Sequence, residues 1–222
     1  APVLAGEPLA VAPEQPPQAH FEALRSERGI ASDQVGMVLP TSLCSGQIAQ
    51  LIAARLNAEG LGRDKGLSRF VALVHTEGCG VAGAEAEEIY ARAMLGYLTH
   101  PLVRCAVLLE HGCEKTHNDY MRNQLAEHGV DTDYFGWASV QLDGGIDKVG
   151  AKVADWFRDK LDTLQPAVGE SAGLGALRVG LVASGPLGDD AAQALARLTR
   201  WLVGAGSTVV VPEHGALLAS AA

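Results

Sequence analysis

Three short apolar runs recur along the chain at equal intervals. They are VGMVLP (35–40), FVALVH (70–75) and CAVLLE (105–110), so each begins 35 residues after the one before. Runs this short and this rich in Val and Leu are typical of strands that are buried on both faces of a parallel sheet. The spacing leaves room for a helix between successive strands, which favours repeated βαβ units.

The segments between the runs have the pattern of helices. Residues 46–60 carry apolar side chains at helical spacing and end in Gly, and residues 116–129 also end in Gly. Residues 84–101 begin with acidic side chains, which suit a helix N-terminus, and end at Pro. The sequence therefore predicts an α/β protein with a parallel, Rossmann-like, doubly wound sheet and helices on both faces.

Four segments are expected along the chain. Residues 1–30 read as a Pro/Ala-rich arm whose last part, HFEALRSERGI, suggests a short helix. Residues 31–165 form the central α/β domain, with a fourth strand at 136–142 and a helix at 145–164. A Pro/Gly/Ser-rich linker (166–176) leads to a second βαβ unit (177–222). The strands of that unit are expected at 177–184 and 207–213, with a helix at 189–206.

Composition excludes several partner classes. The formal net charge is −9 and the chain has no run of Lys and Arg, which argues against a nucleic-acid partner. No apolar run approaches the roughly 18 residues that span a bilayer, and the N-terminus lacks the features of a signal peptide. We therefore expect a cytoplasmic protein, whose four cysteines serve as thiols or metal ligands rather than as disulfides.

Three of those cysteines follow the three apolar runs at nearly the same place. Cys44, Cys79 and Cys113 each lie three or four residues beyond a predicted strand, where the turns of a doubly wound sheet meet and bind ligands. Three thiolates suit Fe²⁺, a three-Cys iron–sulfur cluster, zinc or another divalent metal. Alternatively, cysteines are small buried hydrophobes, and this is the expected role of Cys105 inside its strand.

Other reactive side chains gather at the same strand ends. An acid/base couple is expected there, from His75, Glu114 and Lys115, although a histidine at a strand end is as often a satisfied core residue. Lys115 could equally bind a substrate carboxylate. Polar side chains at the same turns are candidates for substrate contacts, and two of the histidines could also be substitute metal ligands. These candidates are Thr41, Ser42, Thr76, His111 and His117.

The succession VLPTSLC, VALVHTEGC and HPLVRCAVLLEHGCEK resembles the altronate/galactarate dehydratase family, which is related to the large subunit of sulfolactate sulfo-lyase. The resemblance covers roughly residues 35–165, and 177–213 is more loosely similar to the start of the family's C-terminal domain. It implies a lyase that eliminates water from a hydroxy or sugar acid with iron or a similar metal. The residues at family positions are Cys44, His75, Cys79, Cys113 and Glu114, and Lys115 matches some members.

The chain also departs from the family pattern. VASGPLGDD stands where the family has a CGGSD-like turn, and neither the SAF-type module nor the rest of the C-terminal domain is recognised. We expect a fragment, a subunit that works with an SAF-type subunit and a C-terminal region, or a member with changed activity. A homo-oligomer is also expected.

Three functions remain open from the sequence. In the first, a metal-dependent dehydratase, the cysteines hold the metal, Lys115 or His75 removes the proton beside the carboxylate, and Glu114 orients the base or donates to the leaving group. The second is a non-catalytic metal- or iron–sulfur-binding module of the same fold. The third is a doubly wound nucleotide-binding or structural domain with incidental cysteines, although the P-loop and GxGxxG motifs are absent.

Overall fold

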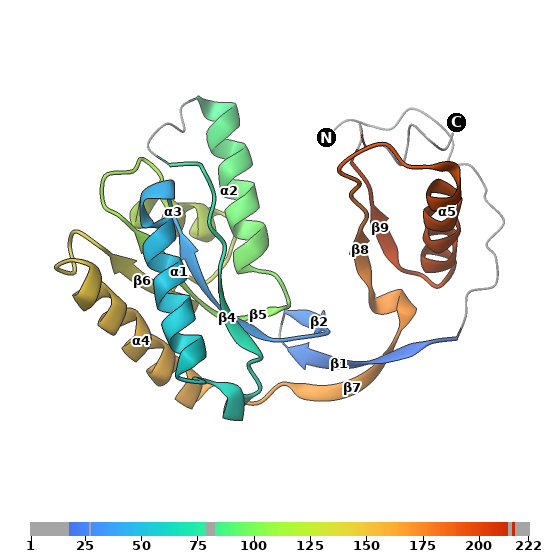
Figure 1. The fold of residues 1–222 in the computed structure, drawn as a ribbon. Coiled ribbons are helices and arrows are strands. Elements are labelled where there is room, and N and C mark those ends of the chain that lie inside the picture. The colour runs from blue at the N-terminus through green and yellow to red at the C-terminus, as the bar shows by residue number, and fades with distance from the viewer. Residues whose placement is uncertain (1–17, 27, 79–82, 213–214, 216–222) are drawn as a thin grey trace. The chain divides into compact units, whose positions relative to one another are not determined.

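The structure is a computed structural model that describes residues 18–26, 28–78, 83–212 and 215. The chain divides into two compact units (Figure 1). Residues 24–169 form the larger unit, and residues 1–23 with 170–222 form the smaller one. The division between residues 169 and 170 lies within the segment that the sequence suggested as a linker.

A four-stranded parallel sheet forms the centre of the larger unit. Its strand order is β4-β3-β5-β6, and each neighbouring pair runs parallel. The strands are β3 (Val35–Pro40), β4 (Arg69–Ala72), β5 (Val103–Glu110) and β6 (Gly136–Ser139). The three apolar runs are thus adjacent strands, and the predicted α/β class with a parallel sheet is confirmed. Both β4 and β6 end earlier than expected: residues 73–75 have no regular secondary structure, and residues 140–142 form a turn.

Helices cover both faces of this sheet. Alternate side chains of β3 and β5 point to opposite faces and enter two separate hydrophobic clusters, as the period of two in a strand requires. Val38 and Leu109 pack in one cluster, whereas Met37 and Leu108 pack in the other. Helices α1 (Leu43–Ala58) and α4 (Ile146–Thr163) contribute to the first cluster, and α2 (Ala84–Leu98) and α3 (Asn118–Glu127) to the second. Short 3₁₀ turns lie at Arg63–Lys65 and Thr132–Tyr134.

Two segments differ from the sequence-based expectation. The stretch from His20 does not form a helix: β1 (His20–Ser26) pairs antiparallel with β2 (Gly29–Ala31), with Leu24 opposite Ala31. Its residues favour a helix locally, but pairing in a sheet satisfies the backbone instead, and Ala23 within this strand is buried. Part of the expected linker is also a strand, β7 (Val168–Gly173), which neighbours β1 in a sheet of order β2-β1-β7.

The smaller unit contains the second βαβ element. Strands β8 (Arg178–Gly180) and β9 (Thr208–Val210) are parallel, and α5 (Asp189–Gly204) connects them. A 3₁₀ turn at Leu174–Ala176 precedes β8. The element is therefore present as predicted, with shorter strands. No helix in the described residues is long and apolar enough to cross a membrane.

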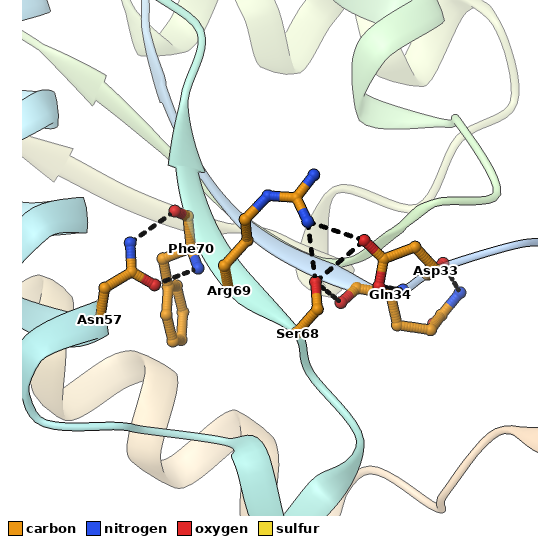
Figure 2. A network of polar contacts seen from close by, with 6 residues as sticks. All are labelled: Asp33, Gln34, Asn57, Ser68, Arg69 and Phe70. Atoms are coloured by element: carbon orange, nitrogen blue, oxygen red, sulfur yellow. Dashed lines mark hydrogen bonds and ion pairs between the residues drawn. The ribbon is translucent and has the colours of Figure 1, made fainter.

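Polar contacts anchor the start of β4, which is one of the two edge strands of the four-stranded sheet (Figure 2). The Asp33 carboxylate accepts hydrogen bonds from Ser68 Oγ and from the Arg69 guanidinium, each 2.9 Å long. Farther along the strand, the side-chain amide of Asn57, in the last turn of α1, donates to Phe70 O at 2.8 Å and accepts from Phe70 N at 2.7 Å. These contacts hold β4 in register beside β3.

Candidate functional site

The turns that follow β3 and β4 are joined at the carboxyl edge of the sheet. Leu43 N donates to Glu77 O at 2.7 Å. The ring of His75 contacts Pro40 O through Nε2 at 2.8 Å, and because a carbonyl oxygen can only accept, Nε2 carries the proton. The turn that contains Cys44 and the turn that precedes Cys79 are therefore held side by side. Cys79 itself lies outside the described residues.

The buried carboxylate of Glu114 joins the β5 turn to the β3 turn. Its Oε1 accepts hydrogen bonds from Thr41 Oγ1 at 2.8 Å and from Ser42 Oγ at 3.0 Å, and both donors are fully buried. The same oxygen accepts from the amide of His111 at 2.8 Å, while Oε2 accepts from the amides of Gly112 at 2.7 Å and Cys113 at 2.9 Å. Three consecutive amides and two hydroxyls thus enclose one carboxylate.

This enclosure keeps Glu114 ionised. Burial works to raise its pKa, but the hydrogen bonds from backbone amides and from the Thr41 hydroxyl outweigh burial and lower the pKa of Glu114 to about 2. At neutral pH the group is a carboxylate whose lone pairs are already used by five donors. It therefore has little capacity to donate a proton or to bind a further group.

Two glycines permit the close approach of these turns. Gly112 has φ +119°, and a Cβ there would lie 2.8 Å from Oε1 of Gln141. Gly78 has φ +154°, and a Cβ there would lie 2.8 Å from Cβ of Ser42. Any side chain at either position would both strain the backbone and push the neighbouring turn away.

The carbonyl of Thr41 holds the same β3 turn from its other side. It accepts hydrogen bonds from the Tyr90 hydroxyl at 2.8 Å and from Thr116 Oγ1 at 3.1 Å. Burial raises the pKa of Tyr90, so its phenol stays protonated and remains a donor. Helix α2 thereby contributes to the positioning of the turn. A tyrosine among apolar helix residues reads as a core aromatic, so the sequence did not indicate this contact.

His75 faces a pocket between the end of β4 and helix α2. The pocket has a volume of about 550 Å³ and is lined mainly by apolar side chains, with Glu77 among its polar residues. The ring lies edge-on to Tyr90, with 5.9 Å between ring centroids. Its Nδ1 atom is buried and has no hydrogen-bond partner among the described residues. Since Nε2 carries the proton, Nδ1 presents a lone pair.

The described cysteines fall into two environments. Cys44, in the first turn of α1, and Cys113 are exposed, whereas Cys105 is fully buried in β5. The burial of Cys105 in a hydrophobic cluster confirms its expected role as a core residue, and it raises the pKa of the thiol to about 12. Cys113 Sγ lies 3.4 Å from Nδ1 of His111, so these two soft donors meet at the turn.

Some of the potential ligand atoms at the turn after β5 are suited to a metal such as iron or zinc. Potential ligand atoms of His111, Cys113 and Glu114 lie within 4.8 Å of one another. A thiolate and an imidazole suit a borderline or soft divalent metal, but the Glu114 oxygens already accept five hydrogen bonds. The side chains available to a metal at this turn are therefore His111 and Cys113, while Cys44 lies on the turn to which Glu114 is bonded.

The remaining predicted site residues lie at the margin of this cluster. Lys115 and Thr76 are exposed. His117 is exposed and accepts a hydrogen bond from Tyr120 N at 3.4 Å, so it acts as the N-cap of α3. Glu110, at the end of β5, accepts from Asn118 N at 2.6 Å and thus also supports that helix start.

Residues 26–163 match the model of the second domain of D-galactarate dehydratase/altronate hydrolase, which is more than half of the 222 residues. No curated protein sequence matches the chain. The matched segment contains the whole four-stranded sheet and all three turns at its carboxyl edge.

Proposed function

The chain belongs to the D-galactarate dehydratase/altronate hydrolase family, and on that premise we propose that it is a metal-dependent hydro-lyase, or a component of one, that eliminates water from a hydroxy or sugar acid. The observation that carries this proposal is the contact between Cys113 and His111 in the turn after β5. The buried, ionised Glu114 of the same turn accepts a hydrogen bond from Ser42, which lies just before Cys44. Thiol and imidazole groups are thereby gathered at the edge of the sheet where α/β proteins bind ligands.

The metal ligands in this proposal are Cys44, Cys79 and Cys113, with His111 as a further donor. A bound iron or similar divalent ion supplies Lewis-acid polarisation of the substrate hydroxyl. Glu114 holds the backbone of Cys113 and His111 in place, so it is a positioning residue. This role replaces the acid function that its residue type suggested, because a carboxyl group with a pKa of about 2 holds no proton to give at neutral pH.

Two side chains can act as the base. His75 offers the lone pair of Nδ1, while Lys115 is exposed beside Glu114 and could instead bind the substrate carboxylate. The base takes the proton beside the carboxylate, and the electron pair of that C–H bond forms the new double bond. The C–O bond breaks, and the leaving hydroxide takes up a proton from solvent to become water.

The test is an absorption spectrum with metal analysis on the full chain purified without oxygen, followed by an assay of iron-loaded protein with galactarate and altronate. Cys113→Ala should lower the bound metal, and Cys105→Ala serves as the matched control because that thiol is buried in β5. Unchanged metal content in Cys113→Ala would refute the thiolate site. Metal binding without turnover would instead support a non-catalytic metal-binding module.

A further inference from the structure

We infer that the exposed face of helix α2 binds a second copy of the same chain, with the two α2 helices antiparallel across a two-fold axis. The surface consists of an apolar stripe on α2, formed by Ala86, Ile89, Ala93 and Tyr97, and of the pocket between this helix and the end of β4. This interface does not depend on the proposed catalytic activity.

The stripe leaves large apolar side chains in contact with solvent. Ile89 is 56% exposed and Tyr97 is 51% exposed. Ala86 and Ala93 are exposed as well, and all four side chains line the same pocket as Val74, which is 45% exposed. Single exposed apolar residues are common on protein surfaces, but a contiguous apolar patch marks an interaction site.

The spacing of the stripe makes it complementary to itself. Its positions follow one another at intervals of three, four and four residues, so they share one side of the helix, and they alternate between small and large. When two copies pair antiparallel about an axis near residue 91, Ile89 faces Ala93 of the other copy and Tyr97 faces Ala86. Each large side chain then meets a small one, and each contact occurs twice, as an isologous interface requires. A parallel pair would instead place Ile89 against Ile89.

Charged side chains along one flank of the stripe fit the same arrangement. Glu88 and Arg92 are both largely exposed, and their charged groups lie 3.9 Å apart within the helix. These positions lie almost symmetrically about the axis, so Glu88 of one copy comes within reach of Arg92 of the other. Opposite charges therefore meet twice across the antiparallel pair, whereas a parallel pair would place like charges together. Such complementarity fixes the orientation of two surfaces.

The pocket beside the stripe suits an uncharged side chain from the second copy. Its lining is mainly apolar, and the charge that it carries is the carboxylate of Glu77. An anion would be repelled there, and a polar group would lose its hydrogen bonds to water. Tyr97 of the second copy, which lies over Ala86, is able to place its ring in this pocket and keep its hydroxyl in water.

The expected dimer is weak. Helix α2 has 15 residues and is therefore about 22 Å long, so one helix pair forms an interface at the small end of the range for specific complexes. We expect a dissociation constant of roughly 1–100 μM.

The experiment is sedimentation equilibrium of the full chain over concentrations that bracket this range, with a reductant that prevents cross-linking through exposed cysteines. The mass should rise from 23.1 kDa towards twice that value. Ile89→Gln should weaken association roughly tenfold or more, because two buried Ile side chains are lost from each dimer. Leu51→Gln is the matched control, since Leu51 is similarly exposed but lies on α1, and it should have no effect. A chain that stays monomeric, or equal effects of the two glutamines, would overturn the inference.

A charge exchange tests the antiparallel arrangement. Glu88→Arg and Arg92→Glu, each made alone, place like charges across the axis and should weaken the dimer roughly threefold to tenfold at low ionic strength. The double variant restores opposite charges and should recover most of the affinity. A double variant that associates no better than either single variant would contradict this arrangement. Urea unfolding checks that all of these surface variants remain folded.

Discussion

Replacing Glu114 with Gln tests whether one ionised carboxylate holds the turns at the site together. Gln has nearly the same shape, but one of its two terminal atoms is a donor rather than an acceptor. All five neighbours now donate to the carboxylate. The hydroxyls of Thr41 and Ser42 can rotate and accept, whereas the amides of His111, Gly112 and Cys113 cannot. At least one buried amide would therefore face the NH₂ group of Gln.

Two lines of reasoning give a similar magnitude for this change. An unsatisfied buried amide costs about 1–3 kcal/mol, and hydrogen bonds to a charged acceptor are stronger than those to a neutral one. Separately, lowering the pKa of Glu114 from 4.5 to about 2 corresponds to roughly 3 kcal/mol of stability at neutral pH. We expect Glu114→Gln to lower the free energy of unfolding by about 3 kcal/mol at pH 7.

The effect should depend on pH in a defined direction. Because the folded pKa of Glu114 is lowered, its contribution is complete above its unfolded pKa of about 4.5 and is lost as the pH falls towards about 2. Gln does not titrate, so the difference in stability between the two proteins should shrink over that window. It should be constant from pH 6 to 8 if this carboxyl group alone is responsible.

The assay is urea unfolding of metal-free protein, followed by tryptophan fluorescence in a Trp201→Phe background. The signal then comes from Trp137 and Trp156, which belong to the same unit as Glu114. Glu77→Gln is the matched control, since it removes an exposed carboxylate from a neighbouring turn. A loss below about 1 kcal/mol, or one that does not change between pH 6 and pH 2, would refute the reasoning.

Three further predictions concern single side chains near the site. Cys113→Ala should lower the iron content without a large loss of stability, while Cys105→Ala should keep the metal and cost about 1 kcal/mol in urea unfolding, because it leaves a small cavity in the core. His117→Ala should cost about 0.5 kcal/mol through loss of the α3 cap and leave ligand affinity unchanged, so a large affinity loss in calorimetry would show that His117 touches the ligand. Gly112→Ala should lower the free energy of unfolding by about 1–3 kcal/mol, because the position has a positive φ and the new methyl group would crowd Gln141. Adding Gln141→Ala should recover only part of that loss, because it removes the crowding and leaves the backbone strain.

The sequence was sufficient for the central sheet because buried parallel strands have a simple pattern. Three apolar runs with helical segments between them could be placed without knowledge of tertiary contacts, and they form β3, β4 and β5 as adjacent strands. The prediction of a helix from His20 was wrong for the opposite reason. Its residues favour a helix locally, and only pairing with residues 29–31, and a neighbouring strand at 168–173, makes it a strand.

The candidate site was predictable in position but not in role. The turns after β3, β4 and β5 could be placed because strand ends are visible in the sequence, and a metal site at their cysteines stays a prediction. The state of Glu114 depends on amides and hydroxyls from two turns that lie about 70 residues apart, and this cannot be read from its neighbours. The roles of Tyr90 and His75 could not be predicted either. The hydroxyl of Tyr90 donates to Thr41 O. The ring of His75 donates through Nε2 to Pro40 O, which leaves Nδ1 unprotonated.

The contact of Asn57 with Phe70 has a consequence for how the protein behaves at high concentration. An edge strand offers unpaired amide and carbonyl groups to which another chain can add a strand. By bonding to both backbone groups of Phe70, the side chain of Asn57 imitates the next strand of a sheet and occupies the place where a foreign strand would begin to pair. One amide on a helix thus leaves an added strand no backbone partner at Phe70, which opposes extension of the sheet beyond β4 at this point.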